Sequence, residues 1–375
     1  MIDKILLFPY WFILKMRHLM FNTGIRKSIK ADVPTICIGN ITVGGTGKTP
    51  HTEMILRSLL QETEWKDKNI AILSRGYKRK SKWFQQVTAD GTAREFGDEP
   101  LQIKKKFPQV TVAVDKSRIR GCNFLAHPDK LLSEKKAAKC RDKNFPAADL
   151  IILDDAFQHR KLNPTVSIVL IDHNRPVFKD HLMPIGKLRD LPERIDSADI
   201  IIVTKCPNGM TGWEKSNWAK AMGFSDFDQT SCTGKRKGKI QYLFFTNISY
   251  DTIQPVYPEA DKHYLYSPRL ILFSGIANDT PLRNYLSSNY KIIRHIKFPD
   301  HHTFSGSDIS QIRSAASAFP TSVIMTTEKD SQRIRDCQKI NKELKLRMFY
   351  VPIKTSFTTD QEHQIFISLL NDRLK

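Results

Sequence analysis

Short apolar runs recur along the chain, and most of them end at Gly, Asp, Thr or Lys. They predict β-strands at Thr35–Ile38, Ile70–Leu73, Val110–Val114, Leu150–Leu153, Ile168–Ile171, Ile200–Val203, Leu270–Phe273, Val323–Met325 and Met348–Val351. Helix-like stretches separate many of them, at Thr52–Gln61, Pro281–Ser287 and Ser307–Ala318. Uninterrupted apolar runs that alternate with helices are typical of a mostly parallel sheet buried on both faces. The pattern therefore predicts an α/β fold.

Two basic, polar stretches interrupt this alternation, at 127–146 and 207–239, and we interpret both as surface insertions. A chain of 375 residues is long enough for two domains. We expect an N-terminal amphipathic segment, a nucleotide-binding core, a basic insertion, and a C-terminal part that holds a smaller α/β domain and returning elements. The corresponding ranges are 1–30, 31–206, 207–240 and 241–375.

The N-terminus carries an apolar run at residues 5–14 (ILLFPYWFIL), which is too short to span a bilayer at about twenty residues per span. At helical spacing, polar residues share one arc and apolar residues lie opposite: Lys4, Lys15, His18 and Asn22 against Ile5, Phe12, Met16, Leu19 and Met20. Such a helix lies in a membrane interface, with Trp11 and the cations near the headgroups. The alternative is a helix docked on the protein's own core, and Pro9 weakens a continuous helix in both cases. We favour the membrane.

The composition of the chain limits the classes of binding partner that we expect. The chain has 59 Lys and Arg against 39 Asp and Glu, a formal net charge of +20, which attracts nucleic acid, anionic lipid or phosphorylated substrates. The basic runs are scattered and lack the interleaved aromatics of a nucleic-acid module, so we expect no nucleic-acid partner. The six cysteines form no CxxC pair and indicate ordinary thiols of a reducing compartment.

The sharpest motif is a glycine-rich loop between a predicted strand and a predicted helix. It reads Thr42-Val43-Gly44-Gly45-Thr46-Gly47-Lys48-Thr49. Glycines let the backbone wrap phosphate oxygens, and the helix N-terminus offers free N–H groups. We expect Lys48 to reach the β- and γ-phosphates of a nucleoside triphosphate and Thr49 to bind Mg²⁺. The loop departs from GxxxxGK[ST] only at Thr42, a turn position.

A second motif is the apolar run at 150–153, which ends in Asp154 and Asp155. In P-loop proteins an acid at the end of a neighbouring strand holds Mg²⁺ directly or through water. We expect Asp155, with Asp154 close by, to complete the metal site opened by Thr49. Adjacent strand residues point to opposite faces, so the two acids need not share a role unless the strand has already ended.

Two further clusters carry acids or histidines. Residues 97–100 (GDEP) place Asp98 and Glu99 in a predicted turn, and residues 298–302 (FPDHH) place His301 after an apolar stretch. Kinases that phosphorylate a hydroxyl use a carboxylate to take its proton. We expect Asp98 to be this general base and His301 to pair with it when the domains close. A metal site at Asp300, His301 and His302 is disfavoured, because adjacent histidines do not converge on one ion.

Together these motifs resemble the tetraacyldisaccharide 4'-kinase family. The resemblance covers nearly the whole chain and rests on the segments 39–50 (GNITVGGTGKTP), 74–77 (SRGY), 97–100 (GDEP), 153–159 (LDDAFQH), 184–189 (PIGKLR), 273–277 (FSGIA), 300–302 (DHH) and 327–330 (TEKD). The departures are modest: Ala156 stands where the family has Gly, and Asp190 where Glu often follows Leu-Arg.

The resemblance implies a P-loop core with a second, smaller α/β domain and a site between them. It implies transfer of the γ-phosphoryl group of ATP, with Mg²⁺, to the 4'-hydroxyl of an acylated glucosamine disaccharide 1-phosphate, which forms lipid IVA in lipid A biosynthesis. It places the enzyme on the cytoplasmic face of the bacterial inner membrane, with no obligate protein partner. It also assigns Glu99, Gln158 and Arg189 to the phosphate or acceptor environment.

Two other functions remain open from the residues themselves. A P-loop GTPase or metallochaperone is one, because residues 203–207 (VTKCP) loosely match a guanine-binding loop, although Pro207 stands where the guanine-binding acid would be. A nucleic-acid-dependent ATPase is the other, on charge alone. A pure binding module is disfavoured, because it would not need carboxylates beside a phosphate loop.

Overall fold

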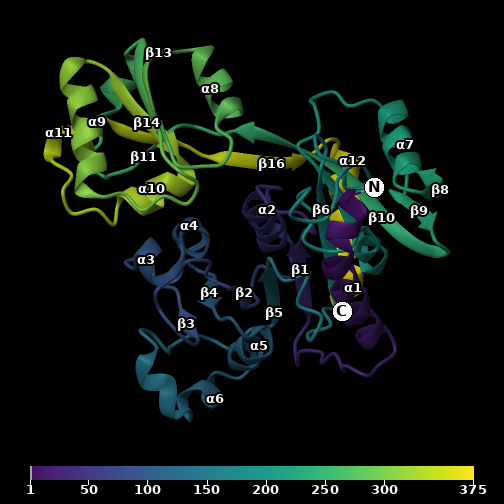
Figure 1. The fold of residues 1–375 in the computed structure, drawn as a ribbon. Coiled ribbons are helices and arrows are strands. Elements are labelled where there is room, and N and C mark those ends of the chain that lie inside the picture. Colours follow the sequence, from purple (N-terminus) through teal and green to yellow (C-terminus); the bar gives the residue numbers. More distant parts are fainter. Residues whose placement is uncertain (1) are drawn as a thin grey trace.

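Two β-sheets organise the chain into two lobes, as the computed structural model of residues 2–375 shows (Figure 1). The large lobe contains an eleven-stranded sheet and the small lobe a five-stranded sheet. Side chains are described from residue 7 onward. The α/β class predicted from the apolar runs is confirmed.

Parallel strands form the middle of the large sheet. Their order is β4 (Thr111–Val114), β2 (Ile70–Ser74), β5 (Leu150–Asp154), β1 (Thr35–Gly39), β6 (Val166–Asp172), β7 (Ile200–Thr204) and β10 (Lys239–Tyr250). Antiparallel strands flank them: β3 (Gln85–Gln86) beside β4, and β9 (Thr233–Arg236), β8 (Phe224–Asp228) and β16 (Ile353–Phe357) on the side of β10. In such a sheet the carboxyl ends of the parallel strands meet at one edge, where ligands bind.

Both faces of the large sheet are covered, which explains why its strands are apolar throughout. Ile36 and Ile38 of β1 point into one core and Cys37 into the other. Helices α2 (Lys48–Gln61) and α12 (Asp360–Leu374) contribute to the first core. Helices α1 (Ile2–Asn22) and α5 (Arg118–Ala126) contribute to the second. The alternation of side chains along each buried strand therefore joins two layers of helices to one sheet.

The small lobe repeats this architecture on a smaller scale. Its strand order is β11 (Gln254–Pro255), β15 (Met348–Val351), β14 (Val323–Thr327), β12 (Arg269–Ser274) and β13 (Lys291–Lys297), all parallel except β11. Its helices are α8 (Thr280–Ser287), α9 (Gly306–Ala318), α10 (Glu328–Ile334) and α11 (Lys342–Arg347). Strand β16 leaves this lobe and pairs with the end of β10, so two antiparallel strands join the lobes (Figure 1).

The two polar stretches contain regular structure. Residues 127–146 form α6 (Pro128–Leu132) and the 3₁₀ helix η1 (Lys135–Lys139), and Leu131, Cys140 and Phe145 from this stretch are buried in the core. Residues 207–239 form α7 (Gly212–Ala221) and the β8–β9 hairpin, which extends the large sheet. The second stretch is thus an edge of the sheet and not a loop lying outside it. The residue limits of the predicted domains stay a prediction.

Helix α1 is continuous from Ile2 to Asn22, so Pro9 does not interrupt it. One side of α1 docks on the large lobe: Leu14 is buried, the Tyr10 hydroxyl donates to the carbonyl oxygen of Arg189 at 3.0 Å, and His18 Nε2 lies 2.5 Å from Asp190 Oδ1. His18, which helical spacing places in the polar arc with Lys15 and Asn22, is buried against this carboxylate, so this part of the arc faces the large lobe. The side chains of Lys4 and Ile5 lie outside the described residues.

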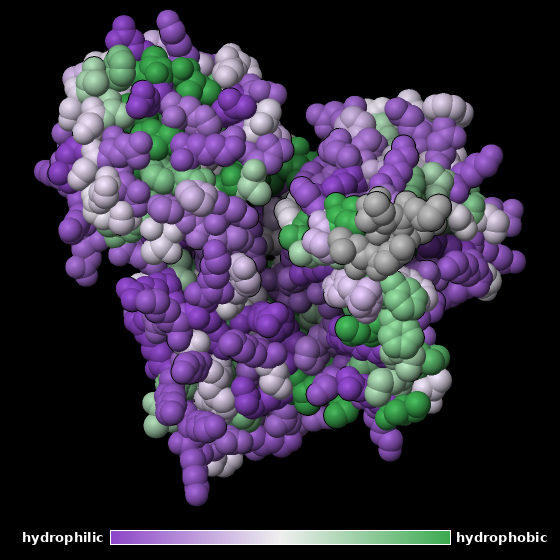
Figure 2. Space-filling model, viewed as in Figure 1, coloured by the Kyte–Doolittle hydropathy of each residue, from purple (hydrophilic) through white to green (hydrophobic). Residues whose placement is uncertain are grey.

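The other side of α1 exposes large apolar side chains: Phe8, Trp11, Phe12, Ile13, Met16 and Leu19. Figure 2 shows apolar residues along this helix on the face of the large lobe. Among the described helices, none has both the length and the apolar character needed to cross a membrane. Docking on the core and an exposed apolar face, which we had treated as alternatives, therefore occur together.

Close packing at the end of β1 gives the first testable prediction. A Cβ atom on Gly39 would lie 2.6 Å from Phe157 Cβ and 2.9 Å from the Phe157 backbone nitrogen. Because overpacking of a core costs about 1–3 kcal/mol, we expect Gly39→Ala to lower the free energy of unfolding by that amount in urea titrations. Gly45→Ala is the control, because a Cβ there meets no atom within 4 Å. Equal stability of the two variants would contradict this packing.

Candidate active site

The glycine-rich loop connects β1 to α2, as predicted, at the carboxyl edge of the large sheet. Gly47 is the N-cap of α2 with φ 84°, a left-handed conformation that glycine adopts at little cost, and no side chain caps the helix there. The first N–H groups of α2 are therefore free of a side-chain partner. Free N–H groups and the helix dipole together attract a phosphate.

Asn40 holds this loop from inside. Its side-chain nitrogen donates to Thr42 Oγ1 at 3.2 Å and to Thr46 Oγ1 at 2.8 Å. His51 holds the other end, with Nδ1 at 2.7 Å from the Gly47 carbonyl oxygen and Nε2 at 2.8 Å from Thr246 Oγ1. Burial lowers the pKa of His51 to about 4, so this imidazole is neutral at physiological pH.

Asp155 faces the loop from the end of β5. Strand β5 ends at Asp154, and Asp155 has φ 47°, so the chain has left the strand before the second acid. This turn brings Asp155 Oδ1 to 3.9 Å from Lys48 Nζ and 2.5 Å from an Arg189 guanidinium nitrogen. The same guanidinium donates to Asn40 Oδ1 at 2.6 Å. Arg189 therefore links the acid to the phosphate loop.

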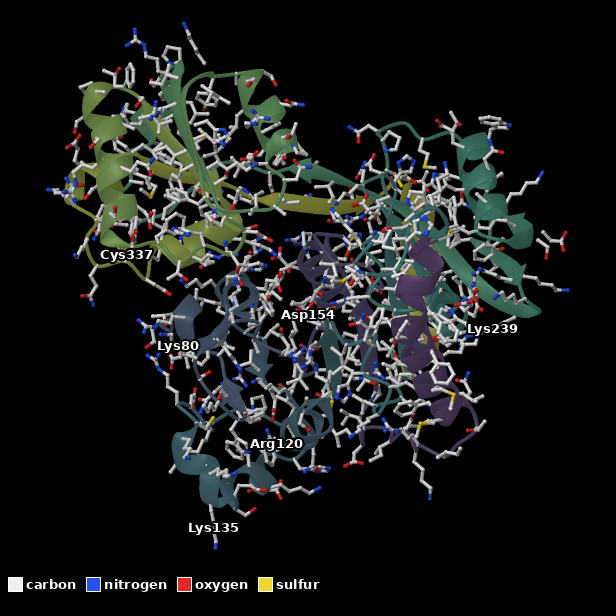
Figure 3. The ribbon with its side chains drawn as sticks, in the orientation of Figure 1. Lys80, Arg120, Lys135, Asp154, Lys239 and Cys337 are labelled. Atoms are coloured by element: carbon white, nitrogen blue, oxygen red, sulfur yellow. The ribbon has the colours of Figure 1, made fainter. Side chains whose placement is uncertain are left out.

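Asp154 is buried in the middle of the site (Figure 3). Ser74 Oγ donates to its Oδ2 at 3.2 Å. Burial, followed by the charges of Glu99 and Asp155, raises the pKa of Asp154 to about 7. For Asp155, burial would also raise the pKa, but the charges of Lys48 and Arg189 hold it below its usual range. Two adjacent carboxyls are thus held in different protonation states near neutrality.

The Thr49 hydroxyl identifies where a cation would fit. Thr49 is 2% exposed, and its Oγ1 has no hydrogen-bond partner among the described residues. A buried hydroxyl without a partner costs free energy unless a ligand uses it. Among those residues, no three His, Cys, Asp or Glu side chains form a ready ion cage. Mg²⁺ suits this donor set, because it keeps few protein ligands and completes its shell with water and phosphate oxygens.

Asp98 and His301 approach each other from different lobes. Asp98 is the first residue of α4 (Asp98–Lys106) and is 7% exposed. The prediction that it lies in a turn is therefore wrong. Helix α4 tolerates Pro100 because this proline lies in the first helical turn. His301, at φ 57° in the loop after β13, has Nδ1 3.6 Å from Asp98 Oδ2. The distance brings the predicted pair together, but Arg333 contacts Asp98 more closely, with Nε at 2.9 Å.

The electrostatics of Asp98 favour its ionised form. Burial would raise the pKa of Asp98, yet the charges of Arg333 and Lys329 hold it well below its usual range. Asp98 is therefore ionised throughout the physiological pH range in this arrangement of the lobes.

The three weaker predictions have different surroundings. Glu99 forms an ion pair with Lys329 of the small lobe. Gln158 lies beside α1, where its backbone carbonyl oxygen accepts from Arg17 at 2.8 Å. Arg189, described above, contacts Asp155 and the phosphate loop. Of the three, only Arg189 lies directly against the loop. Figure 2 shows a hollow between the lobes, lined largely by hydrophilic residues.

Comparisons with known proteins match this geometry to one family. Residues 4–374 match the family described as Tetraacyldisaccharide-1-P 4'-kinase. The chain belongs to this family. It is 36% identical over 372 residues to the tetraacyldisaccharide 4'-kinase of Phocaeicola vulgatus, covering 96% of this chain and 91% of that one. It is 34% identical to the enzyme of the same name from Flavobacterium johnsoniae, covering 96% and 94%.

A solved structure shares the fold of the whole chain. LpxK from Aquifex aeolicus, in complex with ATP, superposes with a TM-score of 0.67 at 25% sequence identity and covers 99% of both chains. The predicted architecture, a P-loop α/β core with a second and smaller α/β part, is therefore confirmed, and so is the resemblance from which it was drawn.

Sequence reasoning missed several residues of this family member's site. Asn40, His51 and Arg333 had no assigned role, although each makes at least two polar contacts there. Asn40 and His51 flank the phosphate loop, and this proximity in sequence was a usable signal. Arg333 follows the 327–330 segment used in the resemblance, but nothing local indicates that it reaches another lobe.

The carboxylate beside Lys48 and Arg189 yields a testable expectation for metal use. If Asp155 completes a Mg²⁺ site with Thr49, Asp155→Asn should lower kcat and raise the Mg²⁺ concentration needed for half-maximal rate, because an amide binds the ion more weakly than a carboxylate. Steady-state kinetics over a Mg²⁺ titration measure both. Asp172→Asn is a matched control, since Asp172 ends β6, on the other side of β1 from β5, and pairs with Lys205 at 2.6 Å. An unchanged Mg²⁺ requirement in Asp155→Asn would refute the assignment.

Proposed function

We propose that this chain transfers the γ-phosphoryl group of ATP to the 4'-hydroxyl of a tetraacyldisaccharide 1-phosphate, an acylated glucosamine disaccharide, and so forms lipid IVA in lipid A biosynthesis. The observation that carries the proposal is the meeting of two sets of residues. A phosphate loop with Lys48 and the unpartnered Thr49 hydroxyl faces Asp155 in the large lobe, and Asp98 meets His301 between the lobes. Family membership supplies the acceptor.

The phosphate loop would hold and polarise ATP. The N–H groups at the start of α2 and the Lys48 ammonium attract the β- and γ-phosphates, and their charge stabilises the charge that develops on the transferred group. Thr49 and Asp155, with Asp154 behind them, would hold Mg²⁺, which neutralises phosphate charge when bound. Arg189 orients Asp155 for this purpose through its contact at 2.5 Å.

The acceptor's proton needs a base. The 4'-oxygen attacks the γ-phosphorus, the bond from that phosphorus to the β–γ bridging oxygen breaks, and ADP leaves with the bond's electrons. The hydroxyl proton passes to Asp98, and His301 positions this carboxylate. Because one group comes from each lobe, lobe closure completes the pair and limits transfer to water.

The N-terminal helix would place the enzyme at the cytoplasmic face of the inner membrane. Among the described side chains of α1, six large apolar ones are exposed: Phe8, Trp11, Phe12, Ile13, Met16 and Leu19. A helix whose apolar side is open and whose flanks carry cations suits an interface in which apolar side chains enter the acyl boundary. The acceptor is itself a lipid, so the same surface would deliver it to the site.

The direct test is phosphoryl transfer from labelled ATP to the disaccharide 1-phosphate in detergent micelles. We expect transfer with ATP and little with GTP, and we expect Lys48→Ala to reduce kcat on the order of a thousandfold, because the ammonium stabilises the transferring phosphate. Lys205→Ala is the control, since Lys205 follows the end of β7 and pairs with Asp172. Near-normal turnover by folded Lys48→Ala protein would contradict the proposed role of the loop in phosphoryl transfer.

The proposed base gives a second prediction. Asp98→Ala and His301→Ala should each reduce kcat by about a hundredfold or more, the scale of general acid–base catalysis. The double variant should be little worse than the more damaged single variant, because members of one unit are non-additive. A double-mutant cycle at saturating substrates measures the coupling. Multiplicative losses would mean that the two side chains act separately.

The membrane proposal needs a variant that spares the docked side of α1. Phe12→Ser with Leu19→Ser changes two exposed side chains and leaves Leu14 and His18 in place. We expect weaker binding to anionic phospholipid vesicles in sedimentation, because less apolar surface enters the interface. Trp213→Ser, at an exposed residue of α7, is the control. Equal vesicle binding by all three proteins would contradict a membrane role for this helix.

A further inference from the structure

The guanidinium of Arg333 lies between the two residues of the proposed base pair. Its Nε donates to Asp98 Oδ2 at 2.9 Å, and one terminal nitrogen contacts the same oxygen and also lies 3.1 Å from His301 Nδ1. A guanidinium only donates, so His301 Nδ1 accepts in this contact. Arg333 thus fixes the unprotonated nitrogen of the imidazole and the ionised oxygen of the carboxylate at once.

The small lobe sets the position of Arg333 before Asp98 arrives. Its other terminal nitrogen donates to Asp330 Oδ1 at 2.9 Å and to the Gly275 carbonyl oxygen at 3.1 Å. Asp330 is itself held, because its Oδ2 accepts from the Gly275 N–H at 2.9 Å and from Thr327 Oγ1 at 2.6 Å. Arg333 is 8% exposed and Asp330 is fully buried. The guanidinium is therefore preorganised within its own lobe.

Neighbouring contacts hold α10 against the large lobe along one seam. Lys329 pairs with Glu99, and Lys106 Nζ lies 2.6 Å from Glu328 and 2.7 Å from Glu53. Beyond the end of α10, the Asp336 carboxylate accepts from the N–H groups of Ala93 and Arg94 at 3.3 and 3.0 Å. These contacts belong to the same docked surface that brings Asp98 against Arg333.

We infer that Arg333 is a positioning residue of the phosphoryl transfer, which keeps Asp98 ionised and aligned with His301 when α10 docks on α4. The inference rests on the proposed role of Asp98 as base. It assigns the small lobe a task beyond closing the site, because this lobe then supplies the charge that makes the carboxylate usable. A lysine would hold the charge but could not bridge both partners, since only a guanidinium presents a planar fork of donors.

The charges around Asp98 agree with this role. It is faced from α10 by Lys329, Asp330 and Arg333, from the loop after β13 by Asp300 and His301, and on its own helix by Glu99. Burial would raise the pKa of Asp98, and the charges of Arg333 and Lys329 outweigh it. Without Arg333, the buried carboxyl would bind a proton at higher pH.

The test compares Arg333→Gln with the parent enzyme over pH, using the full chain and the assay described above. We expect kcat to fall at least tenfold and the acidic limb of its pH profile to move to higher pH by about 1–3 units, the usual effect of a close opposite charge on a carboxylate. The infrared band of a protonated carboxyl should appear at correspondingly higher pH and vanish when Asp98→Asn is added. Arg333→Lys should show a smaller shift in the same direction.

Asp336→Ala is the matched control, because it breaks contacts of the same seam without touching Asp98. It should lower kcat without moving the limb or the infrared band. The inference would be overturned by a folded Arg333→Gln enzyme in which the acidic limb of the pH profile and the infrared band of the protonated carboxyl keep their positions. If the Arg333→Gln variant does not fold, an Arg333→Lys enzyme with the same kcat and pH profile as the parent would overturn it. Failure of the proposed base looks different, since Asp98→Ala would then retain kcat.

Discussion

The position of β1 between β5 and β6 in a parallel sheet is the constraint on which the site depends. Because all three strands point the same way, their carboxyl ends open onto one edge, and the loops that follow them must share the same space. The phosphate loop follows β1, and Asp155 follows β5. Lys48, Asp155 and Arg189 meet there although more than a hundred residues of chain separate the first from the second. The sheet brings together charges that no local segment could assemble.

A second constraint arises from dividing the chemistry between lobes. The groups that would hold ATP belong to the large lobe, whereas His301 and Arg333 belong to the small lobe and reach Asp98 across the gap. In the part of the chain that the structure describes, β10 and β16 are the strands that pair across the connection. Two antiparallel strands bend more easily than a packed core, so lobe movement is compatible with rigid lobes. The ion pairs between α10 and the large lobe form the surface on which the two lobes meet, and they form only when the lobes are close together.

Features that depend on one continuous segment could be predicted from the sequence, whereas features that depend on residues far apart in the chain could not. The apolar runs predicted β1, β5 and β12 because burial on both faces leaves no polar position, and Lys48 and Thr49 were identifiable because one loop contains the whole motif. Strand β13 was missed because its exposed charged residues interrupt the apolar pattern. Arg333 could not be predicted at all, since its partner Asp98 lies 235 positions away and only the docking of two lobes joins them. The docking of α1 stayed an open alternative for the same reason, because Asp190, the partner of His18, lies 172 positions away.

The contact between α1 and residues 189–190 fixes the position of this helix relative to the phosphate site. Tyr10 contacts the backbone carbonyl oxygen of Arg189, and His18 contacts the carboxylate of Asp190. The Arg189 side chain extends from the same segment to Asp155. A surface bound to the apolar side of α1 would therefore be tied to the phosphate site through direct contacts of this helix. The height of the reacting centre above such a surface would be a fixed property of the fold. A headgroup would have to rise to that height to react, so the enzyme would measure how far its substrate can protrude from the bilayer.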